Sequence, residues 1–153
     1  MSNFGFERHV NRCSEPCASF SFVPQVVTTI APGGQLVWNA VVENLSRQCC
    51  SRDIDLNTNT GDIFIKREGK YQIGVSMDAP GAADTWVQVT TGNGATARPT
   101  VYNLTGQITW NLYVKRDSVI KVVVGGTGAG LVFTPGADVT LPMAVIEIVK
   151  LEA

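Results

Sequence analysis

The fold is decided by the stretch Asp62-Ile63-Phe64-Ile65-Lys66-Arg67-Glu68-Gly69-Lys70-Tyr71-Gln72-Ile73-Gly74-Val75-Ser76-Met77. Two runs rich in β-branched and aromatic residues, 62–66 and 71–77, flank Glu68-Gly69. In the second run apolar and polar side chains alternate, which is the pattern of a strand with one buried face. Because a short gap containing glycine between two such runs favours a tight turn, we expect a β-hairpin that turns at residues 68–69.

The same signal continues on both sides of this stretch. Strands are expected at residues 19–23, 26–30, 35–42, 86–90, 107–114, 119–124, 131–133 and 143–151. Glycine-rich turns separate several of them, at residues 32–34, 92–94 and 125–130. No segment keeps a helical period. About ten short strands with turns between them predict a single all-β sandwich or barrel.

The composition fits one domain that packs against neighbours. The chain has 153 residues, of which 44% are hydrophobic and 16% are charged. An average soluble domain carries about 25% charged residues, so less of this surface is suited to remain bare. The net charge is −1 and the basic residues do not cluster, which argues against a nucleic-acid partner. No apolar run has the length of a membrane span, and residues 1–10 lack the apolar core of a signal peptide.

Residues 1–18 differ from the rest because they are polar and show no periodicity. We interpret them as an N-terminal connector arm and residues 19–153 as the folded domain. The chain has four cysteines, two in the arm and two in a predicted loop: Cys13, Cys17, Cys49 and Cys50. Zinc, free thiols and disulfides, including a bond between subunits, are all compatible with these positions, and four cysteines alone allow three intrachain pairings.

A family resemblance adds to this interpretation. The spacing of Leu56, Ile63, Gly69, Tyr71, Ile73 and Val75 resembles the signature of jelly rolls of the complement-globular-head and tumour-necrosis-factor-like class. Gly69 and Tyr71 match it, whereas Ile63, Ile73 and Val75 stand where aromatic residues are usual. Residues 62–73 are similar to the corresponding motif of BclA-like domains on Bacillus spores. Residues 86–89 resemble the central hairpin of those domains, and residues 144–151 resemble their last strand.

The resemblance covers roughly residues 19–153 and implies a TNF-like jelly-roll sandwich that forms homotrimers around a threefold axis. Five aromatic residues are candidates for core or trimer contacts: Trp38, Trp86, Tyr102, Trp110 and Tyr113. One feature departs from the spore proteins, because no Gly-X-Y repeat precedes the domain and a collagen stalk needs glycine at every third position. A fibre would therefore be linked by the arm, which resembles the N-terminal connectors of endospore appendage (Ena-type) subunits.

Catalytic and ligand motifs are weak. The single histidine, His9, lies in the arm, and Asp53-x-Asp55 lacks the further oxygen ligands of a calcium loop. Gly126-x-Gly128-x-Gly130 is followed by a strand rather than by the helix that a phosphate site needs. We therefore expect no enzyme activity, no cofactor and no metal.

The leading hypothesis is a self-assembling subunit of a spore-surface (exosporium) fibre or appendage, which becomes extracellular when the mother cell lyses. Its partners would be copies of itself and other spore-surface proteins. Two alternatives remain: a phage fibre or capsid decoration protein located in the virion, and a glycan-binding or adhesion module.

Overall fold

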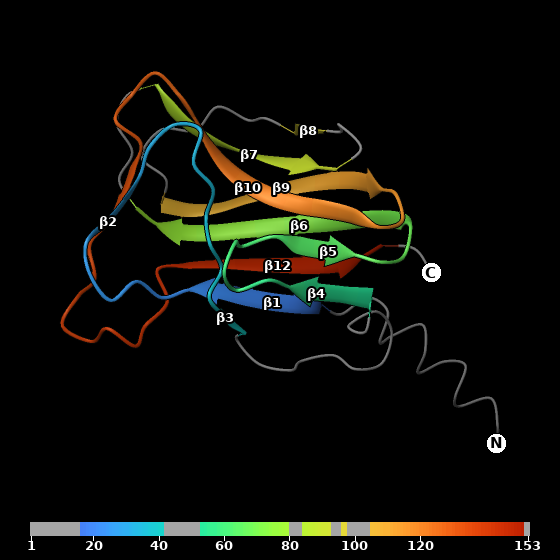
Figure 1. Cartoon of the computed structure of the whole chain (residues 1–153), viewed down its shortest axis with the longest axis horizontal. Helices are drawn as coiled ribbons and strands as arrows, with labels where there is room; N and C mark the ends of the chain where they lie inside the picture. The colour runs from blue at the N-terminus through green and yellow to red at the C-terminus, as the bar shows by residue number, and fades with distance from the viewer. Residues whose placement is uncertain (1–15, 42–52, 80–83, 93–95, 98–104, 152–153) are drawn as a thin grey trace.

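A computed structural model describes residues 16–41, 53–79, 84–92, 96–97 and 105–151, and these form two facing antiparallel sheets (Figure 1). The first sheet has the order β3 (Ala40–Val41), β1 (Pro16–Phe22), β12 (Ala144–Lys150), β6 (Gly69–Asp78) and β9 (Thr105–Val114). The second sheet has the order β4 (Ile54–Leu56), β5 (Ile63–Ile65), β10 (Ser118–Gly126), β7 (Thr85–Thr91) and β8 (Thr96–Ala97). β11 (Leu131–Phe133) and β2 (Thr28–Ile30) pair separately.

The core lies between the sheets because every second residue of each long strand points inward. Tyr71, Ile73 and Val75 of β6 are fully buried, and Ile120 and Val122 of β10 are buried on the opposite sheet. Phe22 and Phe133 meet edge to face, with ring centroids 5.0 Å apart. The predicted all-β jelly-roll sandwich is therefore confirmed.

The predicted hairpin at residues 68–69 is wrong. β5 belongs to the second sheet and β6 to the first, so residues 66–68 carry the chain from one sheet to the other. Gly69 is not among the glycines with positive φ, which in the described chain are Gly33, Gly61, Gly126 and Gly130. Its missing side chain instead leaves space for a lysine, because a Cβ at position 69 would lie 2.9 Å from Cε of Lys150.

Other strands differ from the prediction at their ends. β1 begins at Pro16, so Pro16 and Ala18 of the predicted arm pair with β12, with a register irregularity between them. Of the expected strand at 35–42, the structure retains β3 and an isolated bridge between Gln35 and Val123 of β10, next to which Leu36 N–H donates to Val122 O. β4 was not predicted. The turn predicted at residues 92–94 falls mostly outside the described residues; the strands on either side of it, β7 and β8, pair antiparallel.

The sandwich has two ends, which position everything described below. The end at which β1 begins, here called the proximal end, also carries the β5–β6 link, the β9–β10 turn and the end of β12. The distal end carries residues 23–27, residues 134–143 and the β2–β11 pair (Figure 1). Within the residues that the structure describes, there is no helix with the length and apolar character required to cross a membrane.

Candidate functional site: the open face of the first sheet

The outer face of β12, β6 and β9, here called the open face, points away from the core. Alternation places on it the following side chains, strand by strand: Val145, Glu147 and Val149; Lys70, Gln72, Gly74, Ser76 and Asp78; Gln107, Thr109, Asn111 and Tyr113. The register aligns Glu147, Gly74 and Thr109 in one row across three strands. Because directly opposite residues of neighbouring strands share a face, this row crosses the middle of the surface.

Gly74 makes the centre of the open face flat. A Cβ at position 74 would lie 2.9 Å from Nε2 of Gln107, so the Gln107 amide lies across the glycine. Small polar side chains surround it, and Glu147 is the one charged residue of the central row. A flat surface with few charges allows a second protein surface to approach closely, because little desolvation of charge opposes it.

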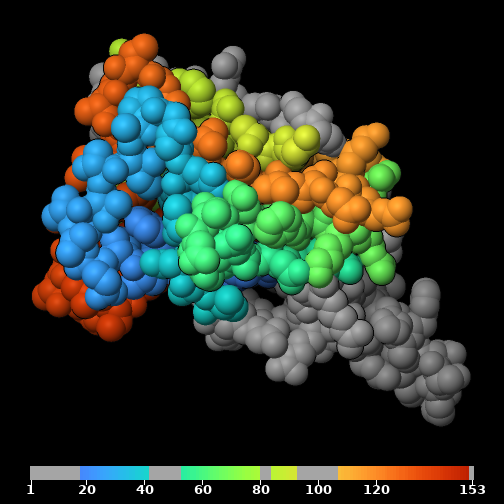
Figure 2. All heavy atoms as spheres, in the orientation of Figure 1, coloured from blue at the N-terminus to red at the C-terminus, as the bar shows by residue number. Residues whose placement is uncertain are grey.

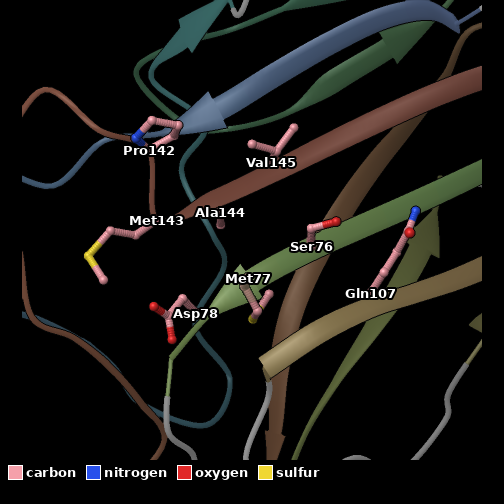
Figure 3. Close-up of a pocket in the computed structure, with 8 residues that line it drawn as sticks. All are labelled: Ser76, Met77, Asp78, Gln107, Pro142, Met143, Ala144 and Val145. Atoms are coloured by element: carbon pink, nitrogen blue, oxygen red, sulfur yellow. The ribbon is translucent and has the colours of Figure 1, made fainter.

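A hollow of about 360 Å³ lies where the open face reaches the distal end. Figure 3 shows Val145, Ser76 and Gln107 rising from three neighbouring strands, with Pro142 and Met143 at the rim. The rim is fixed by backbone hydrogen bonds: Asp78 N–H donates to Met143 O at 3.0 Å, and Met143 N–H donates to Phe22 O at 2.9 Å. The hollow combines apolar walls with a few polar groups, which suits contact with another surface.

A charged cluster occupies the proximal end, around the β5–β6 link. Lys66 Nζ lies 2.5 Å from the Asp55 carboxylate, and Arg67 Nε lies 3.3 Å from that of Asp53. The hydrogen bond and charge of Asp55 raise the pKa of Lys66. The Tyr113 hydroxyl donates to Glu68. The two ion pairs of this cluster, Lys66–Asp55 and Arg67–Asp53, lie at the surface, and such pairs contribute little stability individually. The described residues hold no group of three His, Cys, Asp or Glu side chains suited to a metal.

The residues of the sequence signature lie in the core and not on a site. Ile63, Tyr71, Ile73 and Val75 are fully buried, and Leu56 packs against the same cluster. The Tyr71 hydroxyl donates to Arg67 O at 2.7 Å, which ties β6 to the link between the sheets. Burial raises the pKa of Tyr71 to about 12.

Lys150 lies beside this tyrosine on the inner face of β12. Its side chain is almost buried, and its ammonium lies 6.0 Å from the centre of the Tyr71 ring. Burial, together with the charge of Arg67, lowers the pKa of Lys150. Lys150, Tyr71 and Gly69, which leaves space for the lysine, thus close the proximal end of the core.

The five aromatic candidates separate into distinct environments. Trp38 and Trp110 belong to the core, with 0% and 4% exposure, so neither offers a surface to a neighbour. Trp86 lies on the outer face of the second sheet, over Gly125. Tyr113 is 50% exposed and lies on the open face. Tyr102 falls outside the described residues, as do His9, Cys13, Cys49 and Cys50, and only the backbone of Cys17, in β1, is described.

Gly126, the last residue of β10, and Gly130 serve backbone packing. Both have positive φ, and a Cβ on either would meet the carbonyl oxygen of a neighbouring segment, from Asp84 or from Ile30.

Sequence reasoning missed the residues that define the open face, above all Gly74, Gln107, Thr109 and Glu147. The alternation within residues 71–77 contained the signal for Gly74, since it marked which positions point away from the core.

Comparison with known proteins places the chain by fold alone. No protein-family model and no curated protein matches its sequence. Among solved structures, Eiger TNF from S. frugiperda is similar with a TM-score of 0.58 and 14% identity, over 88% of this chain and 91% of that one. The globular domain of zebrafish complement 1qA protein has a TM-score of 0.55 and 11% identity, over 88% and 98% of the two chains. Murine APRIL has a TM-score of 0.55 and 15% identity, also over 88% and 98%. The chain therefore has the jelly-roll fold of the TNF and complement-globular-head proteins.

Proposed function

We propose that this protein is a structural subunit, not an enzyme, and that copies of it associate as homotrimers through the open face. One observation carries the proposal: the central strands of the first sheet present a flat surface, built on Gly74 and bearing a single charge in its middle row. Packing the centre of this face around a threefold axis buries little charge, because its other charged residues, Lys70 and Asp78, stand at the two ends of β6. Tyr113, half exposed at the side of this face, supplies an aromatic contact of the kind enriched in interfaces.

The trimers then assemble into a fibre or appendage on the surface of a bacterial spore, in the manner of BclA-like and Ena-type proteins. Residues 1–15 link one trimer to the next, and disulfides of Cys13, Cys17, Cys49 or Cys50 lock the assembly. This location makes copies of the chain and other spore-surface proteins its partners. The resemblance of residues 62–73 to the BclA-like motif supports the spore setting, and the fold supports the trimer unit.

Removal of residues 1–15 tests the linking step. The truncation stops before Pro16 because β1 begins there and its first residues pair with β12. The full chain is expected to form filaments visible by electron microscopy, and the truncated chain to remain as single trimers with an unchanged circular dichroism spectrum. Filaments formed by the truncated chain would refute the linking role. A monomeric full chain without filaments would refute the structural function itself.

The disulfide part is tested separately on denaturing gels with and without reductant. Covalent multimers that disappear on reduction are expected. Monomer bands under both conditions would exclude crosslinking between subunits.

A further inference from the structure

An exposed apolar patch lies at the distal end. Its members are Val26 (70% exposed), Val27 (61%), Leu141 (61%) and Val139 (37%). They come from two loops that meet there, because Gln25 Nε2 donates to Val139 O at 3.4 Å. Figure 2 shows the two loops, blue and red, together at one end of the molecule. We call these four side chains the distal patch.

The distal patch is unlike the rest of the surface. The other strongly exposed large apolar side chains of the described residues are Val41, Phe64, Tyr113 and Leu151, and they are spread over separate elements. Single exposed apolar residues are ordinary, whereas a group of them marks an interaction site. The distal patch continues toward the hollow of the open face, since Pro142 and Met143 follow Leu141 directly.

The two ends of the sandwich differ in charge: the proximal end holds both signs, with Asp53, Asp55, Glu68 and Asp117 beside its basic residues, whereas the described charged residues of the distal end are all acidic. The described acidic residues of the distal end are Asp78, Asp84 and Asp138. The described lysines and arginines lie at the proximal end, apart from Lys121, which faces Asp62 from the middle of β10. Asp138 borders the distal patch and accepts hydrogen bonds from Thr140 N–H at 3.0 Å and from Thr140 Oγ1 at 2.5 Å. These bonds lower the pKa of Asp138, so its negative charge persists in mildly acidic solution.

The chain contains a segment of complementary chemistry. Residues 1–12 carry two alternating aromatic residues, Phe4 and Phe6, followed by Arg8 and Arg12 with Glu7 as their one acid. This segment joins the domain at Pro16, which lies at the proximal end, opposite the distal patch. Given the proposed assembly function, on which this inference rests, we propose that residues 1–12 of one copy dock on the distal patch of the next copy. Phe4 and Phe6 cover the valines and Leu141, and the arginines face the distal aspartates.

The geometry favours a neighbouring copy over the same chain. A strand as long as β6, with 10 residues, extends about 33 Å. The ten residue steps from Phe6 to Pro16 also reach about 33 Å when fully extended. Folding back would use that whole reach to cover the sandwich from end to end. A copy stacked end to end brings the patch next to the point where the segment leaves its own domain.

A mixing experiment with two full-length variants tests this docking. The acceptor-defective variant carries Val26→Asp and Leu141→Asp, and the donor-defective variant carries Phe4→Ser and Phe6→Ser. Val41→Asp is the matched control, because Val41 is 59% exposed but lies in β3. All are kept in reductant to exclude disulfides and are measured by electron microscopy and by light scattering after size exclusion. The two variants alone are expected to stay as single units, and their equal mixture to form a species of twice that mass.

Each outcome decides the proposal. Doubling in the mixture, with filaments from the wild type and from Val41→Asp, supports docking of the segment on the distal patch. Filaments formed by the acceptor-defective variant would overturn the docking proposal. An equal mixture that does not double in mass would also overturn it, because the segment then binds its own chain or another surface. If the wild type itself forms no filaments either with or without reductant, the proposed function fails instead. Circular dichroism verifies that each variant is folded. The single substitution Leu141→Asp, without Val26→Asp, serves as a second acceptor-defective variant in the same test.

Discussion

Individual glycines in this sandwich differ in what their missing side chain permits. Gly126 has φ of 107°, and a Cβ there would lie 1.7 Å from the carbonyl oxygen of Asp84. Gly33 has φ of 93° but nothing within 4 Å of the Cβ position. Gly136 has neither constraint. Gly33 therefore shows the effect of a left-handed backbone alone, Gly126 adds a clash with a neighbouring carbonyl, and Gly136 shows neither effect. The sequence by itself does not distinguish these three cases.

Alanine substitution at these three positions is expected to give a graded loss of stability. Gly136→Ala should change the free energy of unfolding by less than about 0.5 kcal/mol. Gly33→Ala should cost about 1 to 2 kcal/mol for the left-handed backbone. Gly126→Ala adds a backbone clash and should cost about 3 kcal/mol or more. Urea unfolding followed by tryptophan fluorescence measures all three. Equal losses at positions 33 and 126 would show that the carbonyl of Asp84 moves aside.

Tyr71 links stability to alkaline pH. Its pKa rises from 10.0 to about 12 in the folded chain because burial disfavours the phenolate. Because the pKa is higher in the folded chain than in the unfolded chain, the contribution of Tyr71 to the free energy of unfolding is complete below pH 10. It is lost as the pH rises toward 12.

Tyr71→Phe is expected to cost about 1 kcal/mol at neutral pH, because the hydrogen bond to Arg67 O disappears. The advantage of the wild type in unfolding free energy should shrink above pH 10 and reverse by about pH 12, because a pKa shift of this size outweighs one hydrogen bond and phenylalanine does not ionise. Urea unfolding at several pH values in this range measures the effect, and parallel pH profiles would contradict it.

Among the elements, the long strands were predictable and their partners were not. Alternation in residues 71–77 and 107–114 located β6 and β9, because period-two burial is a local property. The choice of sheet is not local, and residues 62–77 resemble a hairpin although β5 and β6 lie in opposite sheets. β4 has only three residues, Ile54–Leu56, which is too short for its pattern to stand out. The open face could not be predicted either, because it depends on the pairing register of three strands. That register brings Gly74 between Glu147 and Thr109.

The link between β5 and β6 is expected to tolerate no shortening. Facing sheets lie about 10 Å apart, and four residue steps from Ile65 to Gly69 reach about 13 Å. Deletion of Arg67 leaves about 10 Å of chain and removes the carbonyl that Tyr71 contacts. The deleted chain should lose cooperative thermal unfolding by circular dichroism.

Deletion of Gly136 is the matched control, because nothing lies within 4 Å of its Cβ position. That variant should unfold within about 5 °C of the wild type. A stable, cooperative Arg67 deletion would mean that the link has slack and that the crossing does not fix the start of β6.

At the scale of the whole molecule, the two sheets present different outer faces, and only one is proposed to pack against other copies. Thr109 is exposed on the open face beside Gly74, and Gln88 of β7 points outward from the second sheet. Arginine at position 109 would place a guanidinium in the middle of the proposed interface. Taking this charge out of water costs several kcal/mol even with Glu147 in the same row, because the desolvation of two ions offsets their attraction, and a symmetric trimer incurs that cost in every subunit.

Thr109→Arg is therefore expected to convert the oligomer to monomers, whereas Gln88→Arg should keep its mass. Sedimentation velocity in reducing buffer measures both, and an unchanged circular dichroism spectrum verifies that the substitutions leave the domain folded. If Gln88→Arg dissociates the oligomer and Thr109→Arg does not, the interface lies on the second sheet. If both variants keep the mass, subunits associate without either sheet face, and contacts at the two ends of the sandwich become the basis of assembly.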